Sequence, residues 1–125
     1  MSEAERPDHS EITTLAQRQL DAYNRADLDA FCACYHPDVI VRDAEGEVTL
    51  QGMTAFRARY ATMFERGGFG ASVPQRISLG EHCVDYERYW RDATDERPRV
   101  TGEVLVRYCL RDGLIGEVQF FHPTS

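Results

Sequence analysis

The chain has 125 residues, of which 42% are hydrophobic and 28% charged, which is the size and composition of one globular domain. Its net charge is −7 and acidic residues are interleaved with the basic ones, which argues against a nucleic-acid-binding surface. All 14 basic residues are arginines, so the lysine needed for Schiff-base, pyridoxal-phosphate or Walker A chemistry is absent.

The sequence shows no segment suited to a membrane and no metal-binding spacing. Its apolar runs fall short of the ~20 residues that a membrane helix requires, and residues 1–10 are polar, unlike a signal peptide. The four cysteines lack the paired spacing of a zinc site, and Cys32 and Cys34 would point apart on a helix. We expect a flexible leader over residues 1–10, one domain over residues 11–122, a cytoplasmic location, and neither metal nor cofactor.

Two helices are predicted near the N-terminus. Apolar residues from Ile12 to Tyr23 recur at helical spacing, and Gln19 lies inside this apolar stripe. Asp27 is suited to cap a second helix. Pro37 is expected to end that helix, because its ring cannot continue a helix and disfavours helical angles in the residue before it.

A short strand and a third helix are predicted next. The β-branched run 39–41 predicts a strand, and residues 48–50 predict a second extended piece. Thr54 is expected to cap the third helix, and Gly67-Gly68 is expected to end it.

The remainder of the chain has the pattern of strands. They are expected over residues 72–79, 83–91, 100–110 and 114–121, the last two joined by an Asp112-Gly113 hairpin turn. Helices gathered early and strands gathered late predict an α+β fold, with the helices packed on one face of a curved sheet.

The strand over residues 83–91 presents two different faces. Val84, Tyr86, Arg88 and Trp90 share the more apolar face, which is expected to point inward. Arg88 would then bind an anion near a pocket. In a plainer interpretation it is a surface arginine beside acidic neighbours.

The following strand predicts a contact between two copies of the chain. Val104, Val106 and Tyr108 are expected to point inward, which leaves Leu105 and Cys109 on the outer face. Apolar residues on an outer sheet face need cover, so we expect a homodimer formed through this face.

Four stretches together resemble a known superfamily. They are residues 20–31, the Tyr-His-Pro-Asp-Val run at 35–39, Gly52 before the third helix, and the hairpin at 111–115. They resemble the nuclear transport factor 2-like superfamily, which includes ketosteroid isomerase and the SnoaL-like polyketide cyclases. The resemblance implies one SnoaL-like domain shaped as a cone, in which three N-terminal helices pack on a strongly curved, mostly antiparallel sheet. The cone would enclose a pocket for a small hydrophobic ligand.

Asp43 is the candidate catalytic residue that this resemblance implies. Residues 39–46 resemble the segment of ketosteroid isomerase that carries its catalytic carboxylate, and Asp43 falls on that position. A carboxylate facing an apolar pocket could move a proton between two carbons, acting first as base and then as acid. The alternative is that Asp43 caps the turn that follows the strand.

Gln19 falls where ketosteroid isomerase has the tyrosine of its oxyanion hole, and its amide can also donate to a carbonyl oxygen. The acid of that oxyanion hole falls on Val104 or Val106, so rapid steroid isomerisation is not expected. Tyr35 and Tyr60 fall at the positions of two hydrogen-bonded tyrosines that support the site of ketosteroid isomerase. An Asp43–His122 pair would instead suit dehydratase chemistry.

Helical periodicity and strand parity together predict the lining of the pocket. The expected residues are Gln19, Tyr23, Tyr35, Asp43, Phe56, Tyr60, Val104, Val106, Tyr108, Val118 and Phe120, with His122 at the mouth. Two functions remain open. One is a cofactor-independent isomerase, cyclase or dehydratase that acts on a hydrophobic carbonyl compound through Asp43. The other is a non-catalytic ligand-binding or interaction domain of the same fold.

Overall fold

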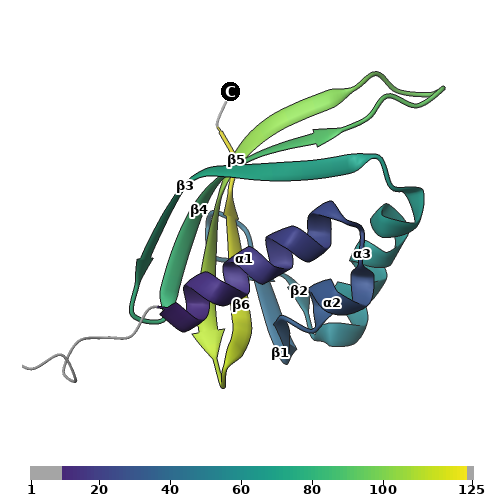
Figure 1. Ribbon diagram of the computed structural model, residues 1–125. Coiled ribbons are helices and arrows are strands. Elements are labelled where there is room, and N and C mark those ends of the chain that lie inside the picture. The colour runs from purple at the N-terminus through teal and green to yellow at the C-terminus, as the bar shows by residue number, and fades with distance from the viewer. Residues whose placement is uncertain (1–9, 124–125) are drawn as a thin grey trace, which may run out of the picture.

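The computed structural model describes residues 10–123, which form three helices and six strands (Figure 1). In chain order these are α1 (Ser10–Asn24), α2 (Leu28–Cys32), β1 (Tyr35–Arg42), β2 (Val48–Gln51), α3 (Met53–Arg66), β3 (Phe69–Leu79), β4 (His82–Arg91), β5 (Val100–Arg111) and β6 (Leu114–Phe121). Of the expected leader, residues 1–9 lie outside the described residues, and Ser10 is the first residue of α1. No helix of the described part is long and apolar enough to cross a membrane.

The strands form one sheet in the order β2-β1-β6-β5-β4-β3, in which every neighbouring pair is antiparallel except β1 and β6. The sheet is strongly bent, and α1 crosses its concave side while α2 and α3 close one end (Figure 1). The pairing of β3 with β4 shifts register between Ser72 and Gln75, around Pro74. Such a bulge loosens the ladder where a strand has to bend. The predicted α+β fold is confirmed.

Local signals place the ends of the helices. The Asp27 carboxylate accepts the Ala30 N–H at 3.1 Å, so it caps α2 as predicted. Gly52, with φ +87°, caps α3 in place of Thr54, because the chain needs a backbone angle there that only glycine adopts freely. Gly67 ends α3 as predicted.

Pro37 does not end a helix, contrary to the prediction. The helix α2 stops at Cys32, and β1 already begins at Tyr35. The ladder between β1 and β6 is interrupted between Tyr35 and Ile40. A proline is tolerated there because this part of the strand needs no N–H for the ladder.

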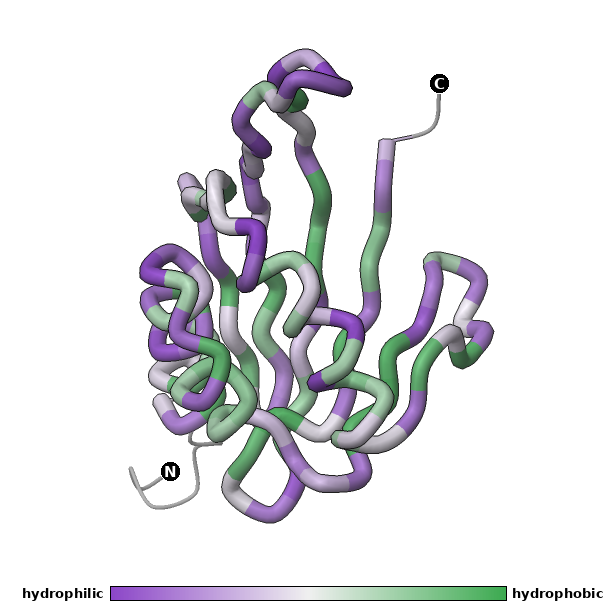
Figure 2. The backbone as a smooth tube through the Cα atoms, turned by 90° about the vertical axis from the view of Figure 1, so that its right-hand side faces the viewer, coloured by the Kyte–Doolittle hydropathy of each residue, from purple (hydrophilic) through white to green (hydrophobic). Residues whose placement is uncertain are grey.

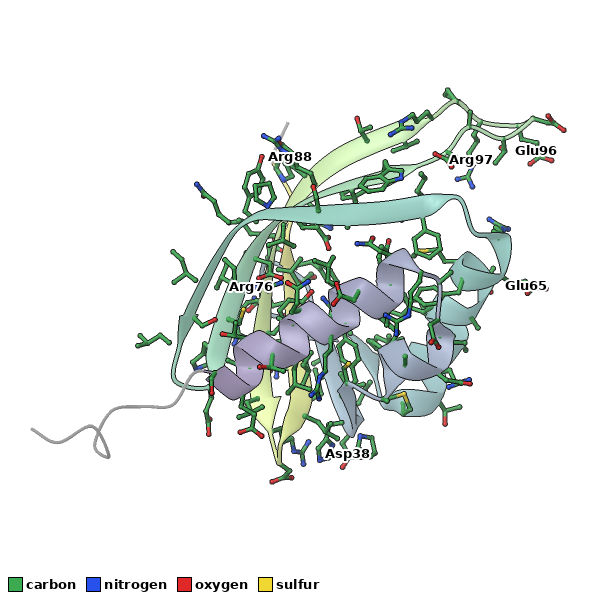
Figure 3. All side chains as sticks on the ribbon, viewed as in Figure 1. Asp38, Glu65, Arg76, Arg88, Glu96 and Arg97 are labelled. Atoms are coloured by element: carbon green, nitrogen blue, oxygen red, sulfur yellow. The ribbon has the colours of Figure 1, made fainter. Side chains whose placement is uncertain are left out.

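The face of β5 that was expected to point inward is buried, with Val104, Val106 and Tyr108 in the core, and Leu105 is 45% exposed on the other face. The prediction that the face of β4 with Arg88 points inward is wrong. Cys83 and Asp85 are the buried residues of β4, and Arg88 lies on the outer side of the sheet (Figure 3).

A buried ion pair explains why β4 turns its more polar face inward. Arg76 of β3 donates to both carboxylate oxygens of Asp85, at 2.6 and 3.0 Å, and also to Gln17 of α1 at 2.8 Å. Figure 3 shows Arg76 between the sheet and α1. A carboxylate whose partner is built into the adjacent strand can be buried, and the polar face of β4 can therefore lie inside.

Candidate functional site

A cavity of about 270 Å³ lies between the helices and the concave face of the sheet. The structure places nine of the expected residues on its wall: Gln19, Tyr23, Tyr35, Tyr60, Val104, Tyr108, Val118, Phe120 and His122. Phe56 and Val106 are each 1% exposed but sit behind the wall, in the core. Helical periodicity and the alternation of side chains along β5 and β6 therefore predict most of the residues of this wall, because both patterns depend only on local spacing in the sequence.

Asp43 does not line the cavity. It follows the last residue of β1, and its Oδ1 accepts the backbone N–H groups of Glu45 at 3.1 Å and Glu47 at 2.9 Å. Its side chain therefore caps the β1–β2 turn, which is the alternative role raised for it above. The Asp43–His122 pair is not formed either, because His122 lies at the cavity and Asp43 does not.

Gln19 holds two buried tyrosines in one hydrogen-bond chain. Its Oε1 accepts the Tyr35 hydroxyl at 2.9 Å, and its Nε2 donates to the Tyr108 hydroxyl and to the Ala16 carbonyl, both at 3.0 Å. Both amide hydrogens of Gln19 are thus in use, so the amide orients the tyrosines and leaves no donor for a ligand. Gln19 therefore does not itself donate to the carbonyl of a ligand, contrary to the prediction.

The chain of hydrogen bonds ends in a donor. Tyr108 accepts from Gln19, and its own hydroxyl hydrogen has no acceptor within residues 10–123. Burial raises the pKa of Tyr35 and of Tyr108 well above the usual value, so both remain neutral and protonated. Each bond in such a chain polarises the next. The Tyr108 hydroxyl is therefore available to donate to an oxygen of a bound ligand.

Glu87 is the carboxylate of the cavity wall. It projects from β4 on the same face as Asp85, opposite Val104 of β5, and it is half-buried. Within residues 10–123 it forms no hydrogen bond and no ion pair. Burial, together with the nearby charge of Asp85, raises the pKa of Glu87 from 4.5 to about 7. The group can therefore either accept or donate a proton near neutral pH.

Sequence reasoning missed Glu87 because it placed the wrong face of β4 inward. The available signal was Asp85, which is a weak one. A strand that carries Asp85 and Glu87 on one face can bury that face only if a basic residue on a neighbouring strand pairs with one of them, and Arg76 does so. That partner is apparent only from the pairing of β3 with β4, which positions Arg76 opposite Asp85.

Aromatic rings form the rest of the wall. Phe31 lies 4.8 Å from Tyr60 and 6.0 Å from Tyr23 between ring centroids. Burial raises the pKa of Tyr60 to about 12. The ring of Tyr89 of β4 lies against Gly102 of β5, where a Cβ would overlap it. A wall of rings with a few polar groups suits an apolar, ring-containing ligand.

Residues 10–123 contain no cluster of three or more His, Cys, Asp or Glu residues that could hold a metal ion.

Residues 16–118 match the profile of the SnoaL-like domain. No curated protein matches the sequence. Many solved structures resemble the fold, including the following three. Each is less than 25% identical to this chain, so the likeness shows the fold alone. An uncharacterised cystatin-fold protein from Novosphingobium aromaticivorans has a TM-score of 0.78 and 24% identity, over 87% of this chain and 96% of its own. A proposed ketosteroid isomerase from Kribbella flavida has a TM-score of 0.75 and 19% identity, over 95% and 82%. A Mycobacterium tuberculosis protein in complex with estradiol-17β-hemisuccinate has a TM-score of 0.77 and 13% identity, over 90% and 94%.

Proposed function

Because the chain belongs to the SnoaL-like domain family, we propose that its cavity binds a small hydrophobic carbonyl compound and that Glu87 transfers a proton on it. The observation that supports the proposal most strongly is the state of Glu87. It faces an aromatic cavity without a hydrogen-bond partner in residues 10–123, and its pKa is raised to about 7. A carboxyl group kept in this state is poorly suited to a structural role and well suited to acid–base catalysis.

The proposed reaction needs only residues of this chain. The ionised Glu87 takes a proton from the carbon next to the carbonyl of the ligand, and the oxygen then carries the negative charge of an enolate. The Tyr108 hydroxyl, held by Gln19, donates to that oxygen. Glu87 then returns the proton to the same or to another carbon, which would give exchange or isomerisation respectively.

The size and lining of the cavity support a ligand with one or two rings. The wall contains Tyr23, Phe31 and Tyr60, and about 270 Å³ is close to the lower limit for ligand pockets. The structural neighbour from Mycobacterium tuberculosis binds a steroid ester, which supports a ring-containing ligand for this chain also. Proton transfer distinguishes the proposal from a non-catalytic binding domain of the same fold.

Deuterium exchange on a simple ketone tests the proposal. The bicyclic ketone 2-tetralone has acidic hydrogens beside its carbonyl, and NMR in deuterium oxide measures their exchange. The wild-type protein should accelerate the exchange, with a rate that rises with pH through an apparent pKa of about 7. Glu87→Gln should lower the enzymatic rate about 10²–10⁴-fold. Glu65→Gln, an exposed glutamate of α3, is the matched control and should leave it unchanged.

Two results would contradict the proposal. In the first, Glu87→Gln exchanges as fast as the wild type. In the second, the ketone binds in the cavity without acceleration of exchange, which would support the non-catalytic binding domain instead.

We further propose that a second copy of the chain covers the outer face of the sheet. Ile77 is 75% exposed, Leu79 71% and Leu105 45%. The strand pairing puts all three on that face, since Ile77 opposes Val84, Leu79 opposes His82, and Leu105 opposes Tyr86. Exposed apolar side chains on one face of two strands, β3 and β5, are typical of a subunit contact.

A further inference from the structure

A second hollow adjoins the cavity, between the end of α3 and the hairpin that joins β4 to β5. It has a volume of about 550 Å³. The hairpin projects past the helices (Figure 1), and its tip is hydrophilic (Figure 2). The Asp92 N–H donates to the Gly68 carbonyl at 2.7 Å, so the two walls are joined at their base. We call this hollow the arginine groove, because Arg59, Arg66, Arg91 and Arg97 line it.

The arginines of this groove differ from the others in the described part of the chain. Eight arginines elsewhere lie within ion-pair distance of a carboxylate: Arg25, Arg42, Arg57, Arg76, Arg88, Arg99, Arg107 and Arg111. Within residues 10–123, only Arg18 and the four arginines of the groove have no such partner. Asp92, the acidic residue of the groove lining, lies 3.5 Å from Arg99, which is not part of the lining.

The absence of acidic partners is unexpected in a chain with 21 acidic residues and a net charge of −7. The four arginines repel one another across the hollow, and Asp92, the acidic residue of the lining, offsets at most one of the four charges. Arg66 lies in the last turn of α3, where a cation is favourable for the helix. No similar reason holds for Arg59, Arg91 and Arg97. Figure 3 shows Arg97 on the side of the hairpin tip that faces α3, whereas Glu96 points away.

The groove and the cavity share part of their walls. Arg59, Met63 and Arg91 line both. On β4, Arg91 follows Glu87 by four residues and therefore lies on the same face of the strand. A ligand that reaches along this face would meet the carboxyl of Glu87 at the inner end and the guanidinium groups of Arg91 and Arg59 at the mouth.

We propose that the arginine groove binds an oxyanion, a carboxylate or a phosphate, carried by the ligand whose apolar part occupies the cavity. This inference rests on the proposed function for the position of the apolar part. The natural ligand would then be an amphipathic anion, with a ring system next to Glu87 and a charged tail that binds the arginines. Guanidinium groups suit such a tail because they donate two parallel hydrogen bonds to carboxylate or phosphate oxygens.

Three matched probes test the inference by calorimetric titration at about 20 mM salt, where screening is weak. They are 6-phenylhexanol, 6-phenylhexanoate and 6-phenylhexyl phosphate, which differ only in the end group. The wild type should bind both anions at least about tenfold more tightly than the alcohol. The tighter of the two anions identifies the tail as a carboxylate or a phosphate.

The variants separate the groove from the cavity. Arg66 and Arg97 are exposed and line the groove alone, so R66Q/R97Q should weaken both anions about fivefold to tenfold and leave the alcohol unchanged. Arg18→Gln, which changes an equally unpaired arginine outside the groove, is the matched control and should have no effect.

The inference is overturned if the anions bind no more tightly than the alcohol, or if R18Q weakens them as much as R66Q/R97Q does. Both results would leave the proposed cavity function intact. NMR shifts of the Val104 and Val118 methyl groups show whether the alcohol enters the cavity. If none of the three probes shifts them, the cavity function fails and this inference fails with it.

Discussion

Glu87 keeps its proton in the folded protein up to a pH of about 7, whereas the unfolded chain releases it near pH 4.5. Between these values the folded state binds more protons than the unfolded state. The contribution of Glu87 to stability is therefore present below about pH 4.5 and is lost as the pH rises through about 7.

Glu87→Gln removes this pH dependence. Relative to the wild type, the free energy of unfolding of the variant should increase progressively from pH 4.5 to pH 7.5, by up to about 3 kcal/mol. Urea denaturation of both proteins at each pH measures the difference, and Glu65→Gln should show none. A difference between Glu87→Gln and the wild type that does not change with pH would show that Glu87 titrates normally.

Asp43 is expected to act only on the turn that it caps. Asp43→Asn keeps an oxygen that can accept the N–H groups of Glu45 and Glu47, so stability and deuterium exchange should both stay close to wild type. Asp43→Ala should cost about 1 kcal/mol, with exchange unchanged. Melting curves and exchange rates of the two variants measure this. A large loss of the deuterium-exchange rate in Asp43→Asn at normal stability would instead show that Asp43 is catalytic.

Local sequence signals were sufficient to predict most helices and strands of the fold. Asp27 caps α2 as predicted, the last strand runs over 114–121 as predicted, and β5 buries Val104 as predicted. These features depend on neighbours within a few residues. The inward face of β4 depends on Arg76 of β3, and the position of Pro37 depends on an interruption of the β1–β6 ladder. Neither of these long-range interactions can be predicted from the spacing of residues in the sequence. Because the pair of Arg76 with Asp85 was not foreseen, Glu87 was placed on the outer face of β4.

The contact between β4 and β5 at the cavity mouth depends on Gly102. A Cβ there would overlap the Tyr89 ring, so Gly102→Ala should displace Tyr89 from the cavity wall. We expect a loss of about 1–2 kcal/mol of stability and weaker binding of 2-tetralone. In a Tyr89→Ala background the same substitution should cost almost nothing, which a double-mutant cycle measures. An equal cost in both backgrounds would contradict the account of this contact.

At the scale of the whole molecule, the proposed homodimer places Leu105 at the contact between subunits. Leu105→Glu should then give a monomer in sedimentation velocity at tens of micromolar, because a buried unpaired charge is costly. Val48→Glu, at an exposed valine of β2, is the control and should leave the dimer intact. A wild-type protein that sediments only as a monomer would contradict the proposal.

The titration of the Glu87 carboxyl is the decisive measurement for its proposed role in proton transfer. Carboxyl ¹³C NMR follows each glutamate with pH, and the signal that disappears in Glu87→Gln identifies Glu87. We expect a midpoint of about 7 for this signal, because the half-buried carboxyl is partly desolvated and lies near the charge of Asp85. A midpoint near 4.5, the value of an ordinary glutamate, would contradict it.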